Sequence, residues 1–244
     1  MKWDLYQYTH PGGRIYNEDR CMVVQQPDRP LLLLLADGLG GHGNGDRAAQ
    51  VAVDCLSKVW REGDPPGADA AARLTVGIAQ ANEKLVEIQQ AEHLSLKTTL
   101  VAASPAEEGL VYANCGDSRL YLIQGGAIRQ VTRDHSVTWK KFQAGQISRR
   151  QINEDEDRTS LLRAVGDSDR CVPDVEFLPM NFAPGDGLLL CSDGFWEYLH
   201  QEEILADCLK SDTAAQWAQW MLLRVMERIR PDTDNLTLLA GLFV

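Results

Sequence analysis

The stretch LLLLLADGLGGHGN, Leu31–Asn44, joins five leucines and an alanine to one aspartate and four glycines. An apolar run this short that ends in glycine predicts a strand buried on both faces, in preference to a helix or a membrane span. Asp37 comes at the end of that strand, and the glycines after it lack Cβ atoms, so backbone groups can approach a ligand closely. A carboxylate here suits a hard cation, although a lone Asp-Gly pair is more often only a turn.

Two more aspartates occupy similar places in the chain. Asp193 follows a second apolar run, Gly187–Ser192, and forms another Asp-Gly pair with Gly194. Asp234 precedes the C-terminal apolar run Leu236–Val244. If these strand ends converge at one edge of the fold, the three carboxylates form an all-oxygen site that favours Mg²⁺ or Mn²⁺.

Length, charge and cysteine content limit the class of protein. With 244 residues, 44% of them hydrophobic, the chain can form one large domain spanning 1–244. A net charge of −11, without clustered Lys and Arg, argues against a nucleic-acid partner. Six cysteines without CxxC spacing indicate neither a zinc site nor a disulfide framework. With no signal peptide and no run of about 18 apolar residues, we expect a soluble, cytoplasmic protein without a membrane segment.

The order of predicted elements indicates the fold class. Helical spacing covers two pairs of segments, Asp46–Arg61 with Ala68–Leu94 and Gln201–Lys210 with Ala214–Arg230. The predicted strands are Trp3–Thr9, Cys21–Val24, Leu31–Asp37, Thr98–Ala103, two within Leu110–Ile123, Ala127–Thr132, Val172–Pro179, Gly187–Ser192 and Leu236–Val244. A doubly wound parallel sheet would need a helix between most pairs of successive strands, whereas here the helices come as two pairs separated by runs of strands. The sequence therefore predicts an α+β fold, a four-layer α-β-β-α sandwich of two antiparallel sheets flanked by antiparallel helix pairs.

Other charged segments leave two readings open. Arg14, Glu18 and Asp19 precede a short apolar strand, where such charges usually form a solvated turn. Alternatively, the guanidinium binds an anion while the two carboxylates help to hold a metal ion or its water. Asp117 lies between two predicted strands and is read as a turn residue. Residues 137–160 lack a clean period and predict a mobile surface insertion with helical turns within it.

Together these motifs resemble those of the metal-dependent protein phosphatases of the PPM (type 2C) family, over nearly the whole chain. In chain order they are Arg14-x-x-Asn17-Glu18-Asp19, Asp37-Gly38-x-Gly40-Gly41-His42, Thr98-Thr99, Gly116-Asp117-Ser118-Arg119, Leu162-Arg163-Ala164-x-Gly166, Ser192-Asp193-Gly194 and Asp234-Asn235. Each motif alone is weak, whereas seven in register are specific. The family's paired antiparallel sheets agree with the fold read from the pattern, and residues 137–160 resemble its variable flap.

The resemblance implies a bacterial stand-alone catalytic domain that hydrolyses phosphoserine and phosphothreonine in proteins. Its partners would be phosphorylated proteins and a cognate serine/threonine kinase system whose action it opposes, and we expect a monomer. Two cations, Mn²⁺ or Mg²⁺, would lower the pKa of a shared water, so that a metal-bound hydroxide attacks phosphorus.

The resemblance also implies which residues hold the cations. Asp37, Asp193 and Asp234 correspond to the ligands of one metal. Asp37, the Gly38 carbonyl and Glu18 correspond to those of the second, partly through water. Asp117 matches a residue that, with Asp193, holds a weaker third metal in bacterial relatives.

Three further residues have implied catalytic roles. Asp19 would orient a metal-bound water, and Arg14 would bind the phosphoryl oxygens through its planar guanidinium. Many eukaryotic members have a histidine, proposed as general acid, directly after the Asp-Gly pair, where this chain has Leu39. His42 is the substitute candidate for that acid, against the alternative that it only caps the glycine loop.

Two other functions compete with the phosphatase hypothesis. A catalytically silent phosphoprotein-binding scaffold of the same fold predicts losses among the metal aspartates, and none is lost. A metal-dependent hydrolase of small phosphoesters differs only in its substrates, so substrate assays would separate it from a protein phosphatase.

Overall fold

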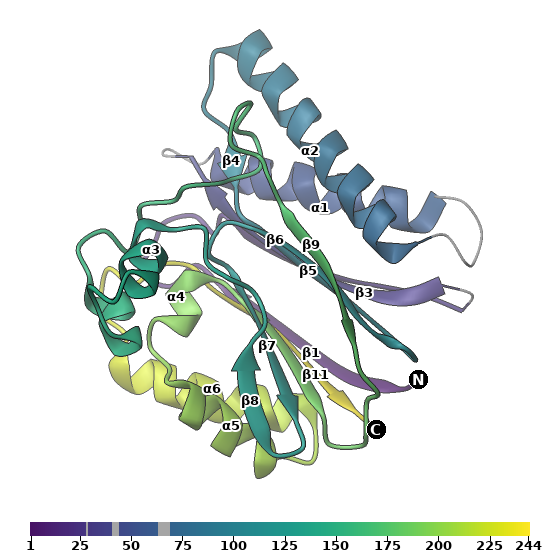
Figure 1. Ribbon diagram of the computed structural model, residues 1–244. Coiled ribbons are helices and arrows are strands. Elements are labelled where there is room, and N and C mark those ends of the chain that lie inside the picture. Colours follow the sequence, from purple (N-terminus) through teal and green to yellow (C-terminus); the bar gives the residue numbers. More distant parts are fainter. Residues whose placement is uncertain (28, 41–43, 63–68) are drawn as a thin grey trace.

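Two antiparallel sheets stacked face to face form the centre of the protein (Figure 1). The computed structural model describes residues 1–27, 29–40, 44–62 and 69–244. One sheet has the strand order β1 (Trp3–His10), β11 (Leu236–Phe243), β10 (Gly187–Cys191), β7 (Arg119–Gln124), β8 (Ala127–Gln130). The other has the order β2 (Asp19–Gln26), β3 (Arg29–Leu39), β5 (Leu100–Ala106), β6 (Gly109–Cys115), β9 (Asp174–Pro179), with β4 (Lys97–Thr98) paired to β3.

A helix pair covers the outer face of each sheet. Helices α1 (Gly45–Glu62) and α2 (Ala70–Glu92) pack on the sheet that contains β3. Helices α5 (Gln201–Leu209) and α6 (Ala214–Arg228) cover the other sheet. The predicted four-layer α-β-β-α sandwich is therefore confirmed. None of the helices in the described part of the chain has the length and apolar character needed to cross a lipid bilayer.

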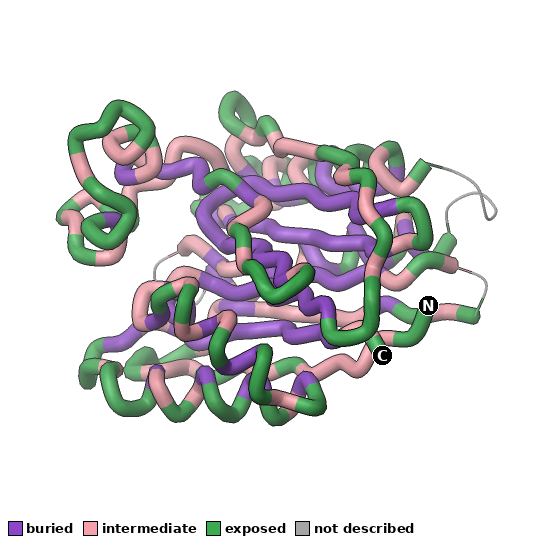
Figure 2. Tube along the Cα trace, turned by 60° about the horizontal axis from the view of Figure 1, so that its bottom comes forward, coloured by how far each residue is buried: buried purple, intermediate pink, exposed green. Residues whose placement is uncertain are grey.

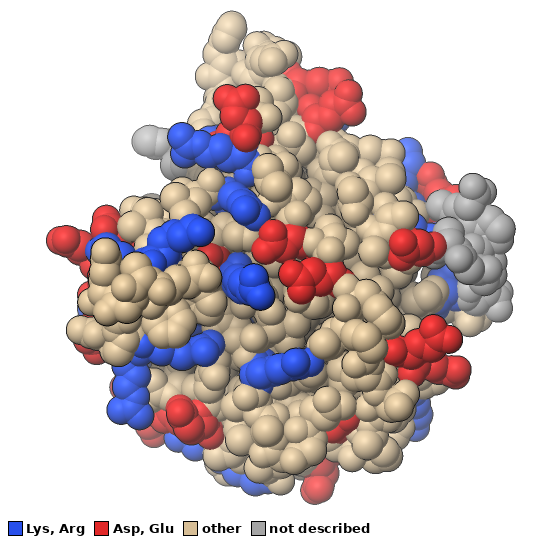
Figure 3. Space-filling view, viewed as in Figure 1, with Lys and Arg blue, Asp and Glu red and all other residues tan. Residues whose placement is uncertain are grey.

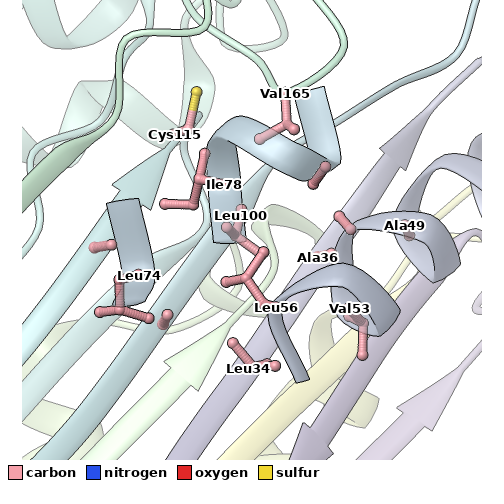
Figure 4. Packing of buried hydrophobic residues seen from close by; sticks show 14 of the residues in the cluster. Leu34, Ala36, Ala49, Val53, Leu56, Leu74, Ile78, Leu100, Cys115 and Val165 are labelled. Atoms are coloured by element: carbon pink, nitrogen blue, oxygen red, sulfur yellow. The ribbon is translucent and has the colours of Figure 1, made fainter. Parts of the chain in front are cut away.

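Strand β3 lies between two hydrophobic layers, as the leucine run predicts. Leu34 and Ala36 point toward α1 and α2 and pack with Leu56 and Ile78 (Figure 4). Leu33 and Leu35 alternate with them, because successive side chains of a strand point to opposite faces, and they belong to the layer between the two sheets. In Figure 2 the strands are buried over much of their length, whereas the helices alternate between buried and exposed residues.

The structure corrects three details of the sequence prediction. Strand β3 does not end at Asp37, because β4 pairs with Gly38 and Leu39 and extends it by two residues. Asp193 does not end a strand but begins a short helix, α4 (Asp193–Trp196), which sequence periodicity did not reveal because it is only one turn long. The strands on either side of Asp117 belong to different sheets, so the chain crosses between the sheets at this point.

The segment predicted as an insertion, residues 137–160, has regular structure of its own. It contains α3 (Val137–Gln143) and a 3₁₀ helix, η1 (Arg149–Glu154). The Ser136 hydroxyl accepts a hydrogen bond from the Trp139 N–H and so caps α3. Figure 1 shows this segment beside the C-terminal end of α6. We refer to residues 137–160 as the flap.

Candidate active site

The strand ends that carry the predicted aspartates lie at the end of the sandwich opposite both chain termini (Figure 1). Asp19 begins β2 and pairs with Asp37 across the sheet, while Asp193 follows β10 and Asp234 precedes the neighbouring strand β11. A cavity of about 630 Å³ opens here. The predicted site residues that line it are Arg14, Glu18, Asp37, Gly38, Asp117, Asp193 and Asp234. Asp19 is buried beside them, so the fold brings together every predicted site residue that it describes.

Two threonines fix the backbone of Asp37. Its carbonyl accepts hydrogen bonds from the Thr98 hydroxyl and the Thr99 N–H, both at 2.8 Å. Its own N–H donates to the Thr99 hydroxyl at 3.1 Å. Thr98 and Thr99 stand among the family motifs, but sequence reasoning gave them no role. They hold the strand position from which the Asp37 carboxylate projects.

Asn235 ties the start of β11 to the loop that carries Arg14 and Glu18. Its side-chain amide donates to the carbonyls of Pro11 and Tyr16, both at 2.9 Å, and its carbonyl accepts from the Glu18 N–H at 2.8 Å. The adjacent Asp234 is thereby set opposite that loop. This positioning role was also missed, although the Asp234-Asn235 motif was its signal.

Glu18 lies against the beginning of α1. The Gly45 N–H, the first of that helix, donates to Glu18 Oε1 at 3.2 Å, where the positive end of the helix dipole favours a carboxylate. Gly38 passes so close to this helix start that a Cβ atom on it would lie 2.1 Å from the Gly45 carbonyl oxygen. Only glycine fits at position 38 without moving α1, which explains the glycine directly after Asp37.

Burial and mutual repulsion raise the pKa values of the clustered aspartates. Burial raises the pKa of Asp19 to about 7, against hydrogen bonds from Thr237 and Ser192, and raises that of Asp193 to about 6. Burial also raises the pKa values of Asp37 and Asp117 well above the usual range, with neighbouring aspartates adding to both shifts. A bound cation would relieve this repulsion, and its positive charge would lower the pKa values of its carboxylate ligands.

The donor set fits a hard divalent cation. It consists of carboxylate oxygens and the glycine backbone, as Mg²⁺ and Mn²⁺ prefer. Asp19 Oδ1 is buried and has no hydrogen-bond partner among the described residues. Within those same residues, no three His, Cys, Asp or Glu side chains already stand in a metal-binding arrangement.

Arg14 lies at the rim of the cavity and pairs with one of these aspartates. Its Nη2 atom is 2.8 Å from Asp234 Oδ2. Both side chains are largely exposed, 55% for Arg14 and 43% for Asp234, so the ion pair contributes little to stability and opens readily. Ile15 and Tyr16, the next two residues, are exposed and line the same cavity.

His42 is the only histidine that the sequence singled out as a candidate site residue. His42 lies outside the described residues, so its role stays a prediction. His135, which sequence reasoning left without a function, is buried beside the site. The ring Nδ1 atom of His135 accepts a hydrogen bond from the backbone N–H of Gly116. The backbone N–H of His135 donates to the Gly116 carbonyl. These bonds hold the loop at Gly116, the residue directly before Asp117.

The raised pKa values predict how the stability of the metal-free protein depends on pH. A carboxyl whose pKa is raised on folding binds more protons in the folded than in the unfolded state, where the pKa of Asp is about 3.9. Its contribution is fully present below the unfolded value and is lost as the pH rises through about 6 for Asp193 and about 7 for Asp19. We expect a lower melting temperature at about pH 8 than at about pH 5.5, with Mn²⁺ removing much of the difference.

Scanning calorimetry in the presence of a chelator measures this dependence. Asp193→Asn removes one of the interacting carboxyls and should flatten the pH dependence of the metal-free protein. A metal-free melting temperature that stays constant or rises between these two pH values would contradict the electrostatic account of the cluster.

Known proteins resemble this chain in sequence and in fold. The chain matches the family described as Protein phosphatase 2C over residues 7–231. It is 37% identical over 211 residues to the serine/threonine phosphatase stp of Listeria welshimeri. The aligned residues cover 84% of this chain and 82% of that protein. The crystal structure of serine/threonine phosphatase Stp1 from Staphylococcus aureus superposes with a TM-score of 0.88 at 29% identity, covering 100% of this chain and 96% of Stp1. The catalytic domain of the phosphatase PstP, crystallised with two manganese ions, has a TM-score of 0.80 at 27% identity, covering 98% of this chain and 97% of that one. The chain thus belongs to the protein phosphatase 2C (PPM) family and is a serine/threonine phosphatase.

Proposed function

We propose that this phosphatase hydrolyses phosphoserine and phosphothreonine in proteins at a centre of two divalent cations, Mn²⁺ or Mg²⁺, and opposes a serine/threonine kinase. The observation that carries the proposal is the aspartate cluster at one cavity. No Lys or Arg in the described part of the chain forms an ion pair with Asp37, Asp117 or Asp193. A silent scaffold has no use for carboxylates that repel one another, whereas a cation site requires them.

We assign the metal ligands to two cation sites as the family motifs imply. Asp37, Asp193 and Asp234 would hold one cation, and Asp37, the Gly38 backbone and Glu18 the second, partly through water. When bound, such cations act as Lewis acids on water and on phosphoryl oxygens. Asp117 would contribute to a weaker third site. Asp19, held by the Ser192 hydroxyl at 2.8 Å, would orient a water for attack.

Arg14 would bind the phosphoryl group of the substrate. A guanidinium donates two parallel hydrogen bonds to phosphate and does not give up its proton, so it neutralises charge without acting as an acid. Its exposed position at the cavity rim supports this role. To bind phosphate it exchanges part of its contact with Asp234. His42 would protonate the leaving serine or threonine oxygen.

The setting of the enzyme is also part of the proposal. We propose that the enzyme acts as a monomer. All six cysteines are free, which supports a reducing compartment, and we place the enzyme in the cytoplasm. The whole of 1–244 would act as one catalytic domain, with residues 137–160 as a flap beside the site.

Metal-dependent phosphate release tests the proposed function directly. Wild-type protein should release phosphate from phosphothreonine peptides with Mn²⁺ and lose this activity with a chelator. Asp37→Asn should reduce kcat/KM by about 10³-fold or more while the protein stays folded, because it removes charge from both proposed cation sites. Asp169→Asn is the matched control, since Asp169 is exposed and outside the cavity.

Two outcomes would contradict the assignment. The first is full activity of Asp37→Asn at modest Mn²⁺ concentration. The second is hydrolysis of small phosphoesters without any activity on phosphopeptides, which would favour a small-molecule hydrolase.

The role of Arg14 has a separate kinetic test. Arg14→Ala should raise KM for phosphopeptides and lower kcat by a smaller factor, for a total loss in kcat/KM of about 10-fold to 10²-fold, because the guanidinium contacts phosphate in both the ground and the transition state. Steady-state kinetics at saturating Mn²⁺ measure both constants. Arg14→Lys should recover only part of the loss, since an ammonium lacks the planar pair of donors. An unchanged kcat/KM in Arg14→Ala would exclude Arg14 from phosphate binding.

A further inference from the structure

A second cavity adjoins the candidate active site and runs between the flap and the C-terminal end of α6. Its volume is about 450 Å³, and it shares Arg14, Thr159, Asp193 and Asp234 with the lining of the first cavity. One wall comes from η1 and the residues after it, and the other from the segment that leads out of α6 to Asp234. We call this cavity the flap groove.

Arginines are concentrated in the flap groove. Five of the chain's seventeen arginines line it, although the whole chain carries 35 acids against 24 bases. They are Arg14, Arg150, Arg158, Arg228 and Arg230. In the view of Figure 3, Lys and Arg side chains lie around the flap, including below it toward α5 and α6, with Asp and Glu side chains among them. Because five acids line the same groove, arginines make up half of its charged Arg, Lys, Asp and Glu residues, a larger share than Lys and Arg have in the chain as a whole.

Three of these guanidinium groups already have carboxylate partners. Arg14 pairs with Asp234, and the Arg158 Nε atom lies 3.4 Å from Glu197 Oε2. Arg228 pairs with Glu203, which is outside the groove lining.

Arg150 and Arg230 differ from the other three. Both are exposed, and neither forms a salt bridge or a side-chain hydrogen bond within the described ranges of the chain. Arg230 acts on Glu197 only through space, opposing the rise in the pKa of that carboxyl. Arg150 comes from the flap wall and Arg230 from the α6 wall, so two uncompensated cations face one groove from opposite sides.

The groove lining also contains five acids, as many as its arginines. Asp193 and Asp234 belong to the candidate metal centre, which leaves Glu154, Glu197 and Asp232 as the other acids of the groove. Glu197 forms an ion pair with Arg158. Glu154 and Asp232 lie close in sequence to Arg150 and Arg230, yet neither comes within ion-pair distance of them among the described residues.

From this geometry we propose that the flap groove recognises an anionic side chain of the protein substrate, a carboxylate or a second phosphate, near the residue that is dephosphorylated. The inference rests on the proposed function, and it names the class of substrate that the site prefers. Arg150 and Arg230 are its specificity-determining residues. Guanidinium groups bind carboxylates and phosphates alike through paired charge-assisted hydrogen bonds, so both sources of negative charge share the same chemistry.

Matched peptides test the preference. Each phosphothreonine peptide carries either Glu or its neutral isostere Gln at a single position. The positions tested in turn are the three before and the three after the phosphothreonine. At low ionic strength, the best-placed Glu should raise kcat/KM over the Gln peptide by about 5- to 10-fold, mainly through KM. The ratio should fall as salt screens these partly exposed charges. A parallel series with a non-hydrolysable phosphonate in place of Glu distinguishes a second phosphate from a carboxylate as the better ligand.

Variants identify the residues responsible. Arg150→Gln and Arg230→Gln should each lower the Glu/Gln ratio by about 2- to 4-fold, and the double variant should bring it close to one. Arg150→Lys and Arg230→Lys should keep most of the ratio, because the charge is retained. Arg129→Gln is the matched control, since Arg129 is exposed on β8, outside the groove. Melting temperatures confirm that each variant is folded.

The outcomes separate this inference from the function on which it rests. A wild-type ratio near one at every position, or a ratio that both Gln variants leave intact, would overturn the role of the flap groove. If the Gln peptides are hydrolysed normally in that case, the phosphatase assignment stands. Failure to hydrolyse any phosphopeptide with Mn²⁺ would instead reject the proposed function.

Discussion

Strand β3 imposes the constraint on which the rest of the molecule depends. Its residues are buried against α1 and α2 on one face and against the second sheet on the other, so it cannot shift without disturbing both layers. Asp37 sits near its C-terminal end, with a backbone held by Thr98 and Thr99. A strand packed on both faces therefore places the carboxylate around which the other aspartates gather.

That placement carries an electrostatic penalty. Asp19, Asp37, Asp117 and Asp193 all have raised pKa values, because the fold buries them near one another without enough positive charge. Arg14 neutralises only Asp234, through an exposed pair at the rim. Strain of this kind is typical of functional sites, where the surrounding structure holds groups that would otherwise separate. In this account a divalent cation relieves the repulsion, and the same charge serves the chemistry.

Sequence patterns predicted the layers better than the connections between them. The leucine run ending in glycine identified β3, and helical spacing found both helix pairs, because these signals are local. The crossing of the chain between sheets at Asp117 depends on the distant partners of β6 and β7, which periodicity does not contain. The convergence of Asp37, Asp193 and Asp234 was inferred from their places at strand ends, whereas the place of Arg14 beside them was decided only by the family motifs, since no spacing rule joins residues so far apart. The flap groove and the Arg14–Asp234 pair needed side-chain positions, and sequence reasoning did not foresee either.

Calorimetric titration of the chelator-treated protein with Mn²⁺ at about pH 6.5, repeated in buffers of different ionisation enthalpy, tests the central claim most directly. If the clustered aspartates hold protons that cations displace, binding of about two equivalents should release a net fraction of a proton or more per protein, and the release should shrink as the pH rises above the raised pKa values. Asp193→Asn should lower both the stoichiometry and the proton release. Absence of Mn²⁺ binding, or binding with no proton release at any pH, would contradict the account.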